Sequence, residues 1–182
     1  HAAATDWQQA AAYVVEGQEA RPLALIEAPT LALLRGIDAQ KEVVAANVMR
    51  LAAGHAAHDM LLWGSRGMGK SALVRAAVVQ AAARHPGCVA LVQIAPTALD
   101  TLHSLFSELG RQDRQFLVFI DDLGFERADG SGPRALRSWL EGGVEARPAN
   151  VRLAVTSNRR AIVARHLDEQ DDPINPRDAV DD

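Results

Sequence analysis

Short runs of apolar residues alternate along this chain with stretches in which apolar residues recur every three or four positions. The short runs are bounded by Gly, Pro, Asp or Asn, a pattern that predicts buried strands. These strands are predicted over residues 60–63, 88–95, 116–120 and 151–156. The intervening stretches predict helices over residues 38–53, 71–84, 97–109 and 133–140.

Capping residues bound several of the predicted helices. Asp38 can accept hydrogen bonds from the first turn of one helix, and Gly54 suits its end. Thr97 and Gly110 are the corresponding predicted cap residues of another helix. Pro133 lies in the first turn of the last predicted helix, where its missing N–H costs no hydrogen bond.

The first 35 residues show a different pattern. Residues 5–17 predict an amphipathic helix that begins at Thr5 or Asp6 and ends at Gly17. Prolines at positions 22 and 29 predict an irregular stretch over residues 21–36. We therefore divide the chain into an N-terminal helix and linker (1–35), a core (36–165) and a polar tail (166–182).

The alternation of strands and helices predicts the fold class. Strands that follow one another through helices pair in parallel, and the helices then cover both faces of the sheet. Residues 116–120 are apolar at every position, as expected of a strand buried on both faces. The sequence thus predicts an α/β protein of three layers.

The charge, hydropathy and cysteine content of the chain indicate which kinds of partner and cellular compartment to expect. Nineteen basic and 23 acidic residues give a net charge of −4, and no basic stripe marks a nucleic-acid surface, so such a partner is neither required nor excluded. No apolar run reaches the roughly 18 residues that span a bilayer. The single cysteine, Cys88, rules out an intrachain disulfide and is expected to be a buried strand thiol. These features are typical of a cytoplasmic protein.

Two other residue types are expected to be structural. The histidines lack the spacing of a metal site and are predicted to lie at the surface or its boundary: His55, His58, His85, His103 and His166. The tryptophans are predicted to pack in the core or an interface: Trp7, Trp63 and Trp139.

The clearest chemical motif is Gly64-Ser-Arg-Gly-Met-Gly-Lys-Ser71, which satisfies G-x-x-x-x-G-K-[ST] between a predicted strand and helix. Such a loop directs backbone N–H groups inward at a helix N-terminus, where they bind phosphate oxygens. Lys70 is expected to reach the β- and γ-phosphates, and the Ser71 hydroxyl to ligate Mg²⁺. The predicted nucleotide-binding residues of this segment are Gly64, Ser65, Arg66, Gly67, Met68, Gly69, Lys70, Ser71 and Ala72.

Arg66 and Met68 carry side chains that the loop does not require. Met68 is expected to contribute only its backbone N–H. Arg66 can either contact a phosphate or remain solvated.

Two adjacent acids follow the apolar strand at residues 116–120, as in a Walker B segment. Asp121 is expected to hold Mg²⁺, usually through a water molecule. Asp122 is in position to orient or deprotonate the attacking water, although many ATPases have the longer Glu there. The alternative is a strand that merely ends in two solvated acids.

The last predicted strand leads into Thr156-Ser157-Asn158. The amide of Asn158 can donate to a phosphate oxygen and accept from a water molecule. Arg159 and Arg160 follow, and either could reach a phosphate or a neighbouring subunit.

Taken together, these segments resemble the AAA+-like bacterial ATPases known as domain of unknown function 815. The resemblance rests on Leu34-Arg-Gly-Ile-Asp38, Asn47 ahead of Gly54, residues 61–71, 119–123 with Phe125-Glu126, 140–143, Arg147-Pro148 and Thr156-Ser-Asn-Arg-Arg160. It implies a cytosolic ATPase that uses ATP and Mg²⁺, with Lys70, Asp122 and Asn158 in catalytic roles, the last as sensor 1. It also implies that Gly36 and Ile37 line the adenine pocket.

The resemblance has further implications for assembly and completeness. AAA+ proteins commonly form rings or nucleotide-dependent assemblies and remodel or load a protein partner. Members of the group continue into a helical lid beyond the point where this chain ends, so we expect the C-terminal lid to be missing or truncated. The chain also begins without Met, and we expect it to be a fragment.

Two other functions remain open at this stage. The first is an adaptor that binds ATP or ADP with little turnover, because Asp122 is short and the lid is not in the sequence. The second is a GTPase-type switch, because Asp121-Asp-Leu-Gly124 matches D-x-x-G. The chain has no N-K-x-D guanine motif downstream, which disfavours the switch.

Overall fold

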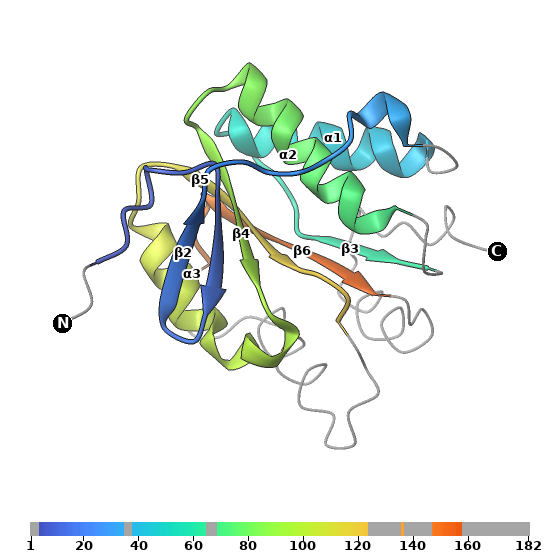
Figure 1. Ribbon diagram of the computed structural model, residues 1–182. Coiled ribbons are helices and arrows are strands. Elements are labelled where there is room, and N and C mark those ends of the chain that lie inside the picture. The colour runs from blue at the N-terminus through green and yellow to red at the C-terminus, as the bar shows by residue number, and fades with distance from the viewer. Residues whose placement is uncertain (1–3, 35–37, 65–68, 124–135, 137–146, 158–182) are drawn as a thin grey trace.

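The computed structural model describes residues 4–34, 38–64, 69–123, 136 and 147–157. Within these ranges the strands form one six-stranded sheet in the order β2-β1-β4-β5-β6-β3 (Figure 1). The strands are β1 Ala12–Glu16, β2 Glu19–Leu23, β3 Met60–Trp63, β4 Val89–Ile94, β5 Gln115–Ile120 and β6 Val151–Ser157. The helices are η1 Leu31–Leu33, α1 Asp38–Ala52, α2 Lys70–Arg84, η2 Pro96–Thr101 and α3 Leu102–Gly110, where η marks a 3₁₀ helix.

The sheet is parallel except at one edge. Strands β1, β4, β5, β6 and β3 run in the same direction, and only β2 pairs antiparallel, with β1. Helices α1 and α2 cover one face, and α3 covers the other (Figure 1). The three-layer α/β prediction is therefore confirmed in the part of the chain that the structure describes.

The side chains of β5 alternate between the two faces of the sheet, so this continuously apolar strand packs against the helices on both sides. Leu117 and Phe119 pack in the cluster beneath α1 and α2. Phe116, Val118 and Ile120 pack in the cluster that includes α3. Because successive side chains point to opposite faces of a sheet, such a strand needs an apolar residue at every position.

The predicted helix over residues 5–17 is wrong, because β1 occupies its second half. Glu16 pairs with Glu19 across a turn in which Gly17 has φ of 62°. The segment Tyr13-Val14-Val15 combines an aromatic and two β-branched residues, which favour a pleated strand. Pairing with β4 then buries Tyr13 and Val15, a benefit that local periodicity cannot reveal.

Most other element boundaries agree with the prediction within about two residues, with two local exceptions. The first is β2, which runs into the stretch predicted to be irregular because Glu19–Leu23 pairs with β1. The second is at residues 96–101, which form the 3₁₀ helix η2 before α3 begins. Thr97 is therefore not the cap; Ala95 precedes η2 and Thr101 precedes α3. The predicted helix over residues 133–140 lies outside the described residues, apart from Leu136, which is helical and buried.

The prediction for Cys88 is also wrong. This thiol is exposed, just before β4, and its Sγ lies 3.6 Å from the carbonyl oxygen of Pro86. The turn at residues 85–88 delays the strand by one residue, so the side chain never enters the sheet.

The expectations for histidine and tryptophan are confirmed where they can be compared. His55, His58 and His103 are exposed and His85 is half-buried, whereas Trp7 and Trp63 are buried. The remaining residues of these sets, His166 and Trp139, lie outside the described residues. None of the described helices combines the length and the apolar character needed to cross a membrane.

A buried arginine attaches the N-terminal segment to the core. Arg114 donates from Nη1 to the carbonyl oxygens of Trp7 (2.8 Å) and Ala10 (2.7 Å), and from Nη2 to that of Val89 (3.3 Å). Tyr13 strengthens the same attachment, because its hydroxyl donates to the carbonyl oxygen of Asp6 at 2.6 Å. Residues 6–10 are thus held by side chains, without a helix or strand of their own.

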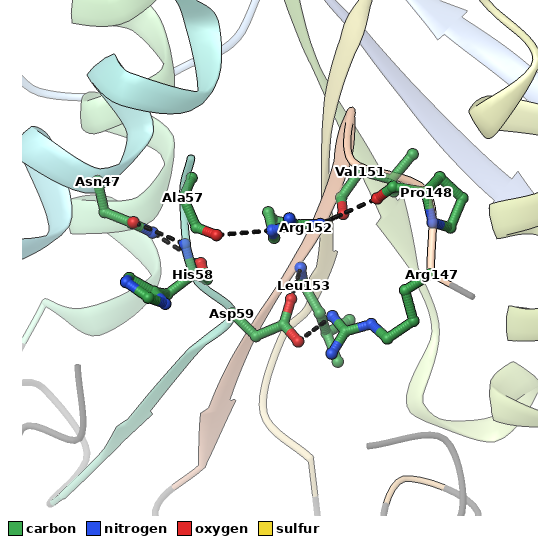
Figure 2. Close-up of polar contacts among 9 residues, drawn as sticks. All are labelled: Asn47, Ala57, His58, Asp59, Arg147, Pro148, Val151, Arg152 and Leu153. Carbon is green, nitrogen blue, oxygen red and sulfur yellow. Dashed lines mark hydrogen bonds and ion pairs between the residues drawn. The ribbon is translucent and has the colours of Figure 1, made fainter. Parts of the chain in front are cut away.

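A second polar network joins the beginnings of β3 and β6 (Figure 2). Asp59 forms an ion pair with Arg147 and accepts a hydrogen bond from the backbone N–H of Leu153 at 2.8 Å. Arg152 donates from Nε to the carbonyl oxygen of Ala57 at 2.7 Å and from Nη1 to that of Pro148 at 2.9 Å. These bonds set the alignment of β6 against β3 at the amino ends of the two strands, opposite the end near Gly64 and Ser157.

Asn47 connects helix α1 to the same network. Its Nδ2 donates to the carbonyl oxygen of His58 at 2.8 Å, and its Oδ1 accepts from the N–H of His58 at 2.9 Å (Figure 2). Asn47 is 1% exposed, so the NH₂ group and the carbonyl oxygen of its side chain both require these partners. Asn47 and Arg147, two residues on which the resemblance rests, therefore have structural contacts here.

We expect Arg114→Ala to destabilise the protein by about 3 kcal/mol, because three carbonyl oxygens lose a charged donor in a buried region. Urea unfolding measures the change. Arg111→Ala removes an exposed arginine three residues away and is the matched control, with an expected effect within about 0.5 kcal/mol. Equal stability of the two variants would contradict this account of the N-terminal attachment.

Candidate functional site

The carboxyl ends of the parallel strands bring four segments of the chain to one edge of the sheet (Figure 1). Open α/β sheets bind ligands at this edge. The segments that meet there are Gly64 after β3, Gly69–Ser71 at the start of α2, Asp121–Leu123 after β5, and Thr156–Ser157 at the end of β6.

Strand β3 and helix α2 enclose the predicted phosphate loop. Gly69 precedes α2 in the left-handed conformation, with φ of 78°, which glycine adopts without steric cost. The first turn of α2 has no acidic residue, so nothing there opposes an anion at the helix N-terminus. The Nζ of Lys70 donates to the carbonyl oxygen of Gly64 at 2.9 Å, which holds the ammonium group across the loop.

The hydroxyl of Ser71 donates to Oδ1 of Asp121. These residues lie 50 positions apart in the sequence, and the parallel sheet brings them together. A hydroxyl and a carboxylate are the oxygen ligands that Mg²⁺ takes in nucleotide sites. The donor set at this edge therefore fits a Mg²⁺ ion bound together with phosphates.

Asp122 has an unusual backbone conformation. Its φ of 57° places it in the left-handed region, the single described case of a residue other than glycine with positive φ. This conformation costs roughly 1–2 kcal/mol for most residues and somewhat less for Asp. Its backbone N–H donates to Oγ1 of Thr156 at 2.8 Å, and that of Leu123 donates to the carbonyl oxygen of Thr156, also at 2.8 Å.

Thr156 also contacts the first acid. Its hydroxyl donates to Oδ1 of Asp121 at 2.7 Å, so one buried side chain connects both acids. Thr156 is not among the site residues predicted from the sequence. Its role depends on β6 lying next to β5, the strand that Asp121 and Asp122 follow, and the sequence alone does not reveal this strand order.

The charge of Lys70 interacts with the carboxylates of Asp121 and Asp122. Burial lowers the pKa of Lys70 below its usual value, and the negative charges of Asp122 and Asp121 partly oppose that effect. The ammonium group is therefore partly desolvated and interacts with two carboxylates. Phosphate oxygens would replace hydration that this cation has lost.

Several predicted site residues cannot be compared with the structure. The residues outside the described ranges are Gly36, Ile37, Ser65, Arg66, Gly67, Met68 and Asn158. Ala72 lies in the first turn of α2 and is half-buried. In the part of the chain that the structure describes, no group of three or more His, Cys, Asp or Glu side chains forms a metal site.

Comparison with known proteins identifies one family. The family described as "Protein of unknown function (DUF815)" matches residues 2–182. No curated protein matches the sequence significantly.

Solved structures share the fold at low sequence identity. Cdc6p of Pyrobaculum aerophilum aligns with a TM-score of 0.56 and 16% identity over 83% of this chain and 45% of its own. Orc1 of Aeropyrum pernix, solved in complex with DNA, aligns with a TM-score of 0.53 and 18% identity over 69% of this chain and 40% of its own. A RuvB mutant of Thermotoga maritima aligns with a TM-score of 0.53 and 16% identity over 79% of this chain and 46% of its own.

The fold class is therefore that of AAA+ P-loop NTPases, as predicted. The chain spans less than half the length of each of these three neighbours.

The left-handed turn leads to a prediction about Asp122. We expect Asp122→Asn and Asp122→Gly to retain the stability of the wild type, since both residues tolerate positive φ. Asp122→Val should lower the free energy of unfolding by about 1–2 kcal/mol, because a β-branched side chain is strained there. Urea midpoints measure these differences.

Asp113→Val is the matched control for this series. Asp113 is exposed and, unlike Asp122, is not among the described residues with positive φ, so its replacement should stay within about 0.5 kcal/mol. If Asp122→Val is as stable as this control, the turn does not require the left-handed conformation.

Proposed function

The chain belongs to the DUF815 family, and we propose that it binds Mg-ATP at the carboxyl edge of its sheet and hydrolyses it. The observation that carries the proposal is the hydrogen bond between Ser71 and Asp121, beside Lys70. Glycine-rich loops alone occur in many folds. A loop whose lysine and serine lie against an acidic strand end combines a phosphate site with a metal site.

Capture of the triphosphate is the role of the loop and the start of α2. The backbone N–H groups of residues 65–72 are the proposed donors to phosphate oxygens, and Lys70 supplies the positive charge. In the structure its ammonium group donates a hydrogen bond to the carbonyl oxygen of Gly64, a contact that orients the side chain. Gly36 and Ile37 are the proposed contacts of the adenine base.

Metal binding is the proposed role of Ser71 and Asp121. Both residues offer oxygen ligands, and their mutual hydrogen bond orients the lone pairs of each. When bound, Mg²⁺ would neutralise negative charge on the β- and γ-phosphates. Asp121 is half-buried and follows a strand whose residues 116–120 are all buried, which limits its freedom to move away.

Hydrolysis requires a group that accepts a proton from the attacking water. We assign this role to Asp122, whose side chain is exposed one residue beyond Asp121. The water oxygen forms a bond to the γ-phosphorus, the bond to the bridging oxygen breaks, and ADP and inorganic phosphate result. Asn158 is the proposed second contact of that water or of the γ-phosphate.

We further infer that turnover is coupled to the remodelling or loading of a protein partner through a ring or a nucleotide-dependent assembly. The AAA+ fold supports this proposal, since many proteins with that fold work as assemblies. Nucleic acid is a less favoured partner, because the chain is acidic and shows no basic stripe.

Calorimetric titration tests nucleotide binding and base preference. We expect ATP to bind more tightly than GTP, and Lys70→Ala to weaken ATP binding by roughly 100-fold, since a charged hydrogen bond contributes about 1.5–3 kcal/mol. Arg84→Ala removes an exposed cation from the far end of the same helix and should bind as the wild type does. Tighter binding of GTP would reject the assignment in favour of a GTPase-type switch.

Phosphate release separates an ATPase from an adaptor. We expect Asp122→Asn to keep ATP affinity and to lower kcat by about 10²–10⁴-fold, the usual contribution of a general base. Asp113→Asn is the control. Because assembly can complete the site, rates are measured at several protein concentrations. A wild type that binds ATP without turnover at every concentration would instead support the adaptor.

A further inference from the structure

Thr156 is a buried polar residue to which the proposed function assigns no role. It lies near the end of β6 and is 1% exposed. Its hydroxyl donates to Oδ1 of Asp121 at 2.7 Å and accepts from the backbone N–H of Asp122 at 2.8 Å. A single hydroxyl therefore contacts the side chain of one acid and the backbone of the next.

The direction of these hydrogen bonds is determined by chemistry. A hydroxyl has one proton, and a carboxylate can only accept, so the proton of Thr156 must point to Asp121. Its lone pair then faces the N–H of Asp122. Such a chain polarises each bond in the same direction, and a buried hydroxyl has no water to replace either partner.

Both hydroxyl donors to Asp121 use the same oxygen. Ser71 and Thr156 donate to Oδ1, which fixes the rotation of the carboxylate from two elements, α2 and β6. Neither of these bonds uses Oδ2, so its lone pairs can be directed to a metal ion or to a water molecule that the ion holds.

The end of β6 also holds the backbone of residues 121–123, which we call the acidic turn. Leu123 donates its N–H to the carbonyl oxygen of Thr156, and the hydroxyl of Ser157 donates to the carbonyl oxygen of Leu123 at 3.1 Å. The N–H of Gly64 donates to the carbonyl oxygen of Ser157 at 3.1 Å. The end of β6 thus joins the acidic turn to the first residue of the phosphate loop.

We propose that Thr156 is the positioning residue of the acidic pair: its hydroxyl orients the Asp121 carboxylate for the metal ion and maintains the left-handed turn that presents Asp122. This inference rests on the proposed function. Both hydrogen bonds of the hydroxyl go to the acidic turn, so Thr156 acts on the metal and on the attacking water rather than on capture of the phosphates.

The inference has a signature that a purely structural role lacks. Loss of the hydroxyl should weaken metal binding and slow turnover while leaving metal-free nucleotide binding unchanged. Thr156→Val removes the hydroxyl at nearly constant volume, and Thr156→Ser keeps it. Thr101→Val is the matched control, because the hydroxyl of Thr101 donates to the carbonyl oxygen of Ala98, away from the acids.

The primary experiment measures Mn²⁺ affinity by electron paramagnetic resonance in the presence of saturating ADP. We expect Thr156→Val to weaken Mn²⁺ binding by about 10–100-fold, the usual effect of removing a group that orients a metal ligand. Thr156→Ser and Thr101→Val should remain within about threefold of the wild type, a shift well below that effect. Calorimetry in EDTA should give the same ADP affinity for all four proteins, and kcat for ATP should fall in Thr156→Val more than KM changes.

The possible outcomes separate this inference from the proposed function. If the wild type binds neither ADP nor Mn²⁺ with ADP, the proposed function fails and this inference fails with it. If the wild type binds both and Thr156→Val binds Mn²⁺ equally well, only the inference is overturned. Equal losses of ADP affinity in EDTA and of Mn²⁺ affinity would also overturn it, because that result indicates a general structural role.

A second measurement covers the case in which Thr156→Val does not fold. A crystal structure of the wild type with ADP and Mg²⁺ should retain the Thr156 hydroxyl within hydrogen-bond distance of Asp121 and of the Asp122 N–H. Separation of the hydroxyl from either partner in that structure would overturn the inference.

Discussion

The parallel pairing of β5, β6 and β3 is the constraint on which the candidate site depends. Each pairing carries the carboxyl end of its strand to the same edge, where Asp121, Thr156 and Gly64 become neighbours although they are far apart in the sequence. A shift of one residue in any pairing would reverse the faces of the side chains and separate the hydroxyls from the acid. The polar bonds of Asp59 and Arg152 at the opposite edge oppose such a shift, because they tie the beginnings of β3 and β6 together (Figure 2).

The candidate site combines features that reduce stability with a scaffold that tolerates them. Lys70 is desolvated enough to lower its pKa, and Asp122 has a backbone conformation that few side chains adopt without cost. Hydrogen bonds from the end of β6 hold the second of these features in place. Because β6 lies between β5 and β3 and is largely buried, the turn after β5 is supported by an interior strand and not by an edge of the described sheet.

The buried parallel strands of the core have a local pattern that predicts them, whereas the N-terminal strand does not. The strands over residues 60–63, 116–120 and 151–156 were predictable because a buried parallel strand needs apolar residues on both faces, and few other structures need that pattern. The N-terminal segment was not predictable in the same way. Residues 12–16 form a strand because the edge of β4 accepts them and because Arg114 and Tyr13 hold the residues before them. Cys88 was misplaced for a similar reason, since the turn before β4 decides which residue first enters the sheet.

The amino-acid sequence by itself determined the chemical types and their order: a glycine-rich loop with Lys70 and Ser71, then two acids, then a hydroxyl-bearing strand end. Those properties depend on residues adjacent in the chain, where spacing alone limits the possible structures. Only the tertiary structure decided that Ser71 and Thr156 donate to the same oxygen of Asp121, and that Asp122 turns into the left-handed region. Such contacts depend on strand order and register, which arise from burial of the whole sheet and not from any one segment.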